Sequence, residues 1–158
     1  MTSRKTPPIG SLAPDFRLRG PGGAFYTLSE HLGANPVVLV FYPLAFSPGC
    51  SHQLPSMQAR LKQFEELGAI VYGISVDSYH SNAAFARSLK LDFPLLSDWD
   101  CQASRDYGVL LEGPDISIRA VFVIGKDGRV LFSEITDDLD DYDHMPGPEG
   151  ALVALKKA

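Results

Sequence analysis

Residues 37–43 read VVLVFYP, an unbroken apolar run that is closed by a proline. Such a run is typical of a β-strand that is buried on both faces, and Pro43 ends it because proline has no N–H to offer a neighbouring strand. A short loop, residues 44–49, then leads to Cys50. From Cys50 onward apolar residues recur at three- and four-residue steps, which predicts a helix that stops near Gly68. A buried strand that leads into an amphipathic helix is typical of α/β proteins.

Strands and helices alternate along the rest of the chain. Two short strands, residues 16–18 and 25–28, flank a Gly-Pro-Gly-Gly turn at 20–23 and predict a hairpin near the N-terminus. The remaining pattern predicts strands at 69–76, 94–96, 121–124 and 129–132, and helices at 82–90, 101–107 and 150–157. We therefore expect a single α/β domain, residues 1–158, with a mixed β-sheet flanked by helices on both faces and an N-terminal β-hairpin extension.

Charge and hydropathy exclude several classes of partner. The 158 residues carry a net charge of −5, and no stretch gathers Lys and Arg as a phosphate-binding surface requires. No segment is apolar over the length of a membrane span, and residues 1–8 lack the apolar core of a signal peptide. We expect a cytoplasmic protein that has neither nucleic acid nor a membrane as a partner.

Metal sites and structural disulfides are not predicted. The four histidines are scattered, and the sequence contains neither H-E-x-x-H nor C-x-x-C. Two cysteines are too few for a disulfide framework, so Cys50 and Cys101 are expected to be thiols unless chemistry changes them. The acidic stretch 137–143 has an aspartate where a calcium-binding loop requires glycine, and we expect a solvated loop there.

Cys50 is a candidate nucleophile because of its position. The start of a helix leaves backbone N–H groups unpaired and carries the positive end of the helix dipole, which stabilises an anion such as a thiolate. Pro43, Ser47 and Cys50 form the pattern P-x-x-x-S-x-x-C, in which the Ser47 hydroxyl can donate a hydrogen bond to a thiolate or to an incoming oxygen. The alternatives are a buried, unreactive cysteine and a serine that only caps the helix.

This pattern resembles the active-site motif of the peroxiredoxin family, P-x-x-x-(T/S)-x-x-C, which is combined with a distant arginine. Other segments resemble the family in the expected order, namely IGSLAPDF at 9–16, GISVD at 73–77, FPLLSD at 93–98 and RAVFVI at 119–124. The resemblance implies a thioredoxin-like fold. Within the alkyl hydroperoxide reductase and thiol-specific antioxidant type, the chain looks closest to the one-cysteine alkyl hydroperoxide reductase E-like or the bacterioferritin-comigratory-protein-like subgroup.

The resemblance implies a thiol-dependent peroxidase that reduces hydrogen peroxide and organic hydroperoxides without a cofactor. Cys50 attacks the peroxide and becomes a sulfenic acid, and Pro43 shapes and shields the site. Arg119, Ser47 and the N–H groups of Gly49 and Cys50 hold the reacting oxygens, although Arg119 has the alternative of being an ordinary surface residue. A thiol reductant of the thioredoxin, glutaredoxin or low-molecular-weight type must then reduce Cys50, and a homodimer is expected.

Three positions depart from the family pattern or leave the mechanism open. Gln53 stands where many peroxiredoxins have glutamate. Pro55 stands where the bacterioferritin-comigratory-protein-like subgroup often has its second cysteine. Cys101 is the remaining thiol, and its strand is expected two strands away from the one before Cys50, at about 10 Å, whereas a disulfide needs Cα atoms within about 7 Å. Cys101 is therefore a possible resolving cysteine after local unfolding, a bystander, or a partner in an intermolecular disulfide.

Two other functions on the same fold compete with the peroxidase. A thiol-disulfide oxidoreductase is disfavoured because the residues after Cys50, Ser51-His52-Gln53, lack the second cysteine of C-x-x-C. A non-enzymatic redox sensor would use oxidation of Cys50 to change a binding surface. Such a sensor would react with peroxide but would not turn over with any thiol reductant.

Overall fold

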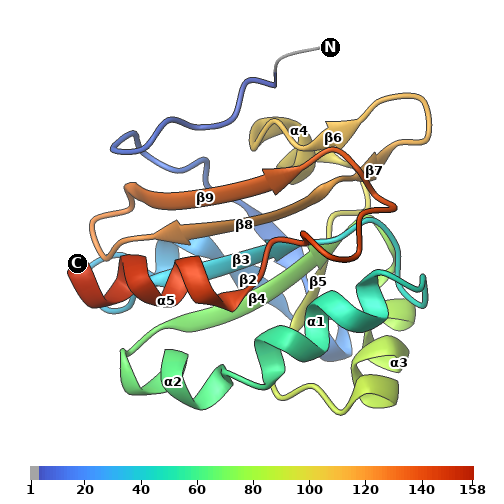
Figure 1. Ribbon diagram of the computed structural model, residues 1–158, viewed down its shortest axis with the longest axis horizontal. Helices are drawn as coiled ribbons and strands as arrows, with labels where there is room; N and C mark the ends of the chain where they lie inside the picture. The colour runs from blue at the N-terminus through green and yellow to red at the C-terminus, as the bar shows by residue number, and fades with distance from the viewer. Residues whose placement is uncertain (1–3) are drawn as a thin grey trace.

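A seven-stranded mixed β-sheet runs through the computed structural model, which describes residues 4–158 (Figure 1). Its strand order is β2-β1-β5-β4-β3-β8-β9. β3, β4 and β5 are parallel, whereas the other neighbouring pairs are antiparallel. The strands are β1 (Arg17–Arg19), β2 (Phe25–Thr27), β3 (Val37–Phe41), β4 (Ile70–Ser75), β5 (Leu95–Ser97), β8 (Arg119–Ile124) and β9 (Val130–Thr136). The predicted mixed sheet and N-terminal hairpin are therefore confirmed.

Helices cover both faces of this sheet (Figure 1). The first, second, third and fifth helices contribute to the core on one face, and the fourth packs on the other. None of the helices in residues 4–158 has the length and apolar character that crossing a membrane requires. The helices are α1 (Cys50–Gln58), α2 (Leu61–Glu66), α3 (Tyr79–Leu89), α4 (Gln102–Asp106) and α5 (Pro148–Lys157), with short 3₁₀ turns at η1 (Pro21–Gly23) and η2 (Leu28–His31).

Apart from shifts of two to four residues at the ends of elements such as α3 and β9, two features differ from the sequence-based expectation. The single helix expected from Cys50 to Gly68 is divided into α1 and α2, because Arg60 leaves the helical region and its N–H bonds to the Met57 carbonyl, three residues back instead of four. A small second sheet, formed by β6 (Leu110–Leu111) and β7 (Ile116–Ser117), was not predicted. Its strands have two residues each, which is too short for an alternating pattern to be recognised.

The central strand β3 is buried along its whole length. Val38 and Val40 belong to the core on the side of α1, α2 and α5, whereas Leu39 and Phe41 belong to the core on the opposite side. Because successive side chains of a strand point to opposite faces, a strand that is covered on both faces needs apolar residues at every position. The unbroken run at 37–42 has this physical origin.

Buried and partly buried hydrogen bonds fix the loop that follows β3 to the neighbouring strand. The Tyr42 hydroxyl donates to Asn82 Oδ1 at 2.6 Å, and Asn82 Nδ2 donates to Ser75 Oγ at 3.1 Å. The Ser75 hydroxyl donates to Asp77 Oδ2 at 2.7 Å, and the same carboxylate oxygen accepts the Ala45 N–H at 2.8 Å. Burial raises the pKa of Tyr42 well above its usual range, so its hydroxyl stays protonated and keeps its role as a donor. The loop is thereby held to β4 and α3.

We expect Asn82→Ala to destabilise the fold. The substitution leaves the Tyr42 hydroxyl and the Leu96 carbonyl without their buried partner, and a lost buried partner costs roughly 1–3 kcal/mol. Urea unfolding followed by circular dichroism should show a free energy of unfolding that is lower by about 2–4 kcal/mol. Asn35→Ala, which removes one exposed bond to the Gly68 carbonyl, is the control and should cost less than about 1 kcal/mol. Equal losses in the two variants would contradict this role of Asn82.

Candidate active site

Cys50 is the first residue of α1, and its side chain is enclosed. The chain leaves β3 after Phe41, bends at Pro43 and reaches the helix through Gly49. Cys50 exposes 0% of its surface and belongs to the core on the helix-rich face of the sheet. The start of α1 contributes the positive end of the helix dipole. Because water does not reach the sulfur in this position, a thiolate there also needs a positively charged partner.

Arg119 provides this partner from 69 residues further along the chain. The antiparallel pairing of β3 with β8 puts Ala120 opposite Phe41, so Arg119, the first residue of β8, lies where the loop to Cys50 leaves β3. Arg119 is 2% exposed, and its Nη1 donates to Cys50 Sγ at 3.1 Å. Arg119 is therefore a buried residue in contact with the sulfur and not a surface residue at a strand start.

The guanidinium of Arg119 has no carboxylate partner. The ion pairs among residues 4–158 are made by Arg4, Arg60, Arg129 and His144. Apart from the sulfur, Arg119 donates to neutral acceptors only, Gln53 Oε1 at 3.2 Å and the Leu139 carbonyl at 3.4 Å, and its Nε is buried without a partner. A buried cation is costly unless an anion compensates it. The geometry therefore favours a Cys50 thiolate as the counter-ion of Arg119.

Gly49 leaves the space that the guanidinium occupies. Its φ of −64° is accessible to any residue, so backbone freedom does not explain a glycine here. A Cβ at this position would overlap Arg119 Nη2 and would come within 2.7 Å of the Tyr142 ring. A larger residue must therefore displace the guanidinium from Cys50. The sequence predicts a role for the Gly49 N–H alone, because this steric requirement comes from β8 and from the loop that precedes α5.

Gln53, whose role the sequence alone leaves open, belongs to this site. It lies one helical turn after Cys50, and it is buried. Its Oε1 accepts from Arg119, while its Nε2 donates to the carbonyls of Phe41 and Pro146, each at 3.4 Å. A glutamate has no N–H for these two carbonyls, and it would also share the charge of the guanidinium. Gln53 therefore orients Arg119 and leaves its positive charge to the sulfur.

The loop 137–147, between β9 and α5, forms the outer wall of the site. Figure 1 shows it crossing beside α1 on its way to α5. Its contacts with the site are the Leu139 carbonyl at Arg119 and the Pro146 carbonyl at Gln53, with the Tyr142 ring next to Gly49. These groups are mostly backbone carbonyls, which every residue carries. The sequence therefore offered no signal that this loop reaches the site.

Two carboxylates of the same loop, those of Asp138 and Asp141, are engaged locally. Asp138 Oδ1 accepts the Asp140 N–H at 3.0 Å, and Asp141 accepts from the His144 ring at 3.0 Å. This hydrogen bond from His144 holds the pKa of Asp141 below its usual value. Among residues 4–158, no group of three or more His, Cys, Asp or Glu side chains is placed to hold a metal ion. The side chains of Asp138 and Asp141 thus behave as those of a solvated turn.

Ser47 and Pro43 shape the loop and do not bond to the sulfur. The Ser47 hydroxyl donates to the Leu44 carbonyl at 2.8 Å, and the Ser47 carbonyl accepts from both the N–H and the hydroxyl of Ser51 at 3.1 Å. The Ser47 hydroxyl therefore neither caps α1 nor donates to the Cys50 sulfur. Pro43 is buried at the bend after β3. Because a hydroxyl reorients by rotation about one bond, the role of Ser47 as a donor to a bound oxygen stays a prediction.

Cys101 lies in a different part of the fold. β4 separates β5, the strand before Cys101, from β3, the strand before the loop to Cys50, which agrees with the expected arrangement. Cys101 is half-buried at the start of α4, and its Sγ donates to the Asp115 carbonyl at 3.6 Å. Burial, and then the charges of Asp98 and Asp115, raise the pKa of the Cys101 thiol. A thiol that stays protonated is a weak nucleophile.

Sequence comparisons relate the chain to known proteins. The pattern of the AhpC/TSA family matches residues 9–133. Alkyl hydroperoxide reductase E of Mycobacterium tuberculosis is 37% identical over 129 residues, which cover 80% of this chain and 84% of that protein. Chloroplastic 2-Cys peroxiredoxin BAS1 of Spinacia oleracea is 33% identical over 141 residues, which cover 83% of this chain and 53% of that protein. The chain thus spans about half the length of the plant relative.

Solved structures show the same similarity in three dimensions. Peroxidoxin BcpB from Mycobacterium tuberculosis superposes with a TM-score of 0.82 at 32% identity and covers 94% of this chain and 96% of its own. AhpC from Enterococcus faecalis superposes with a TM-score of 0.82 at 28% identity, over 94% of this chain and 90% of its own. The thioredoxin-like fold that the sequence implies is confirmed by these superpositions.

We expect Cys101 to react slowly with iodoacetamide near neutral pH. A raised pKa keeps the thiol protonated over the pH range in which an ordinary thiol becomes reactive, so alkylation should rise only at higher pH. Mass spectrometry of Cys50→Ser protein, alkylated between about pH 7 and 10, measures this profile. The same protein unfolded in urea is the control and should follow the profile of a free thiol. Coincident profiles for the folded and unfolded protein would refute the effect of the surroundings of Cys101.

Proposed function

Because the chain belongs to the AhpC/TSA family, the peroxiredoxins, we propose that it is a thiol-dependent peroxidase that reduces hydrogen peroxide and organic hydroperoxides at Cys50. The observation that carries this proposal is the buried guanidinium of Arg119 in contact with the Cys50 sulfur. A cysteine kept for packing alone needs no cation beside it, since bringing a charge into the core costs free energy. A thiol-disulfide oxidoreductase remains disfavoured by the lack of C-x-x-C.

The reaction starts with attack of the Cys50 thiolate on the distal oxygen of the hydroperoxide. An S–O bond forms from the electron pair of the sulfur while the O–O bond breaks, and the leaving hydroxide or alkoxide takes up a proton to become water or an alcohol. Cys50 is oxidised to a sulfenic acid, and the peroxide is reduced. Negative charge moves from sulfur to the leaving oxygen, so groups that stabilise this oxygen lower the barrier.

Arg119 retains donors for the leaving oxygen. A guanidinium has five N–H groups, and those of Arg119 that are already engaged point to Cys50, Gln53 and Leu139. The Nε–H is buried without a partner, so it is available to an oxygen that enters the site. Because the guanidinium is planar and always charged, one group both compensates the thiolate and receives the leaving oxygen.

Access to the sulfur selects among hydroperoxides. Cys50 exposes no surface, and the loop 137–147 closes the outer side through Leu139, Tyr142 and Pro146. The two hydrogen bonds from the site to this loop are long, at 3.4 Å each, and long hydrogen bonds are weak. Moving this loop away from the site therefore costs little hydrogen-bond energy. We therefore expect small hydroperoxides to react faster than bulky ones.

An external thiol is the reductant that fits this chain. One thiol condenses with the Cys50 sulfenic acid to give a mixed disulfide and water, and a second thiol displaces Cys50 and leaves with the first as a disulfide. Two observations argue against Cys101 as the internal alternative, namely the strand between β5 and β3 and the raised pKa of its thiol. The reductant is then of the thioredoxin, glutaredoxin or low-molecular-weight type.

A homodimer in the cytoplasm is the setting that we propose. Leu44 and Phe46 are exposed in the loop before Cys50, and the Phe46 ring is held against Phe85 with a centroid distance of 5.0 Å. Exposed apolar side chains that are held in place support a protein contact surface. Light scattering tests the dimer, and a molecular mass of one chain at all protein concentrations would exclude it.

Cell fractionation tests the proposed compartment. Recovery of the protein from the culture medium or from a membrane fraction would exclude the cytoplasm.

Rapid-mixing kinetics with hydrogen peroxide test the proposed peroxidase. Cys50→Ser should abolish the reaction, and Arg119→Lys should lower its second-order rate constant by about 10²-fold, as expected when one preorganised group is lost. Gly49→Ala should lower it by more than about tenfold, because the added Cβ displaces the guanidinium although Cys50 and Arg119 are both retained in the variant. The wild type should reduce hydrogen peroxide faster than cumene hydroperoxide.

Arg129→Gln and Gly125→Ala are matched controls for these variants. Both positions flank the turn between β8 and β9, outside the site, and both variants should keep the wild-type rate within about twofold. If Arg119→Lys and Gly49→Ala both react with hydrogen peroxide as fast as the wild type, the guanidinium is not needed for the reaction. A wild-type protein that forms one sulfenic acid but turns over with no thiol reductant is a redox sensor and not a peroxidase.

Cys101→Ser should turn over with an added thiol at the wild-type rate. Mass spectrometry after one equivalent of peroxide should show a mixed disulfide between Cys50 and the added thiol in both proteins, because β4 separates the strands that precede the two cysteines. The contrary result is a disulfide between Cys50 and Cys101 in the wild type, with slower turnover in the variant. That result would identify Cys101 as the resolving cysteine.

A further inference from the structure

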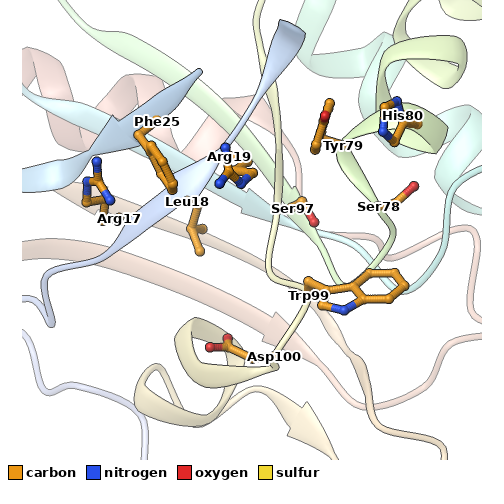
Figure 2. Close-up of a pocket in the computed structure, with 10 residues that line it drawn as sticks. All are labelled: Arg17, Leu18, Arg19, Phe25, Ser78, Tyr79, His80, Ser97, Trp99 and Asp100. Carbon is orange, nitrogen blue, oxygen red and sulfur yellow. The ribbon is translucent and has the colours of Figure 1, made fainter. Parts of the chain in front are cut away.

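We propose that the cavity between the N-terminal hairpin and the start of α3 binds a small organic anion that carries a flat ring, such as an aromatic carboxylate. The cavity has a volume of about 430 Å³ and is lined by residues of β1, β2, β5 and α3 and of the segment after β5 (Figure 2). None of its lining residues belongs to the site around Cys50. The proposal is therefore independent of the peroxidase.

Two guanidinium groups on one aromatic ring form the positive side of this cavity. The register of the hairpin puts Arg19 opposite Phe25, with Arg17 two residues along on the same face of β1. The guanidinium carbon of Arg17 lies 3.5 Å from the centre of the Phe25 ring, and that of Arg19 lies 4.1 Å from it. Figure 2 shows Phe25 between the two arginines. Stacking on the ring restricts both side chains, so their donors are already oriented.

The positive charge of this pair is not compensated. Among residues 4–158, no carboxylate lies within ion-pair distance of Arg17 or Arg19. Arg19 donates one bond, to the Gly23 carbonyl at 2.9 Å, which leaves most N–H groups of the pair for a ligand. Asp100, the acidic residue of the cavity, accepts the Gln102 N–H at the start of α4. An anion that contacts both guanidiniums would remove their mutual repulsion.

The remaining walls of the cavity suit a flat ring. Trp99 is 74% exposed, and Figure 2 shows its indole across the cavity from Arg17. Tyr79 and His80 form a second aromatic wall, with ring centroids 4.0 Å apart. Large exposed aromatic side chains around a concave surface are typical of ligand sites, and the volume lies within their usual range. Charge on one side and aromatic surface on the other together select a ring with a carboxylate or phosphate.

Trp99 allows a direct test, because it is the single tryptophan of the chain. Benzoate should change its fluorescence in a saturable way, with a dissociation constant of about 1 mM or lower. Benzamide, which has the same ring without the charge, and acetate, which has the charge without the ring, should each bind at least about tenfold more weakly. Phenyl phosphate, measured in parallel, distinguishes a carboxylate from a phosphate as the preferred anion.

Variants connect the signal to the two arginines. Arg17→Gln/Arg19→Gln should weaken benzoate binding by at least about tenfold, whereas Arg87→Gln/Lys90→Gln, which removes the same net charge from another cavity, should leave it unchanged. Equal binding of benzoate and benzamide, or equal losses in the two double variants, would overturn the proposal. Acetate that binds as tightly as benzoate would mean an adventitious ion only, and it would overturn the proposal as well.

Discussion

A buried cation without a carboxylate partner is the constraint on which this site depends. The free energy cost of enclosing Arg119 is offset when the group that it touches is negative, and Cys50 is the ionisable group that it touches. The same contact gives the sulfur a counter-ion where water is excluded. Electrostatic compensation therefore works in both directions, and the pair is more stable as thiolate and guanidinium than either charge would be alone in this core.

The fold produces this contact through a simple register. β3 and β8 are antiparallel neighbours, so the end of one strand lies beside the start of the other. The end of β3 leads to Cys50, and the start of β8 carries Arg119, which brings the two side chains to one edge of the sheet. Gly49 and Gln53 then refine the position, the first by leaving space and the second by accepting from Nη1. In the proposed peroxidase reaction, a thiolate alone would add little to the rate because nucleophilicity falls with basicity, so this positioning matters more than ionisation.

The two sides of the site differ in how firmly they are held. On the inner side, hydrogen bonds of 2.6 to 3.1 Å among Tyr42, Asn82, Ser75 and Asp77 fix the loop that carries the cysteine. On the outer side, the loop 137–147 contacts the site through long bonds to backbone carbonyls. The firmly held inner side keeps the sulfur and the guanidinium aligned. The weakly held loop 137–147 is compatible with entry of a substrate.

The sequence by itself determined the elements whose signals are local. The apolar run at 37–42, the helix start at Cys50 and the N-terminal hairpin follow from hydrophobic periodicity and from the placement of proline and glycine. Arg119 could be named through the family resemblance, but its burial and its contact with the sulfur come from strand pairing. Only the tertiary structure decided the space at Gly49, the orientation by Gln53 and the closure by the loop 137–147. A missing Cβ, a neutral amide and a backbone carbonyl have the same appearance in any sequence, and they acquire a role only from the groups that the fold places against them.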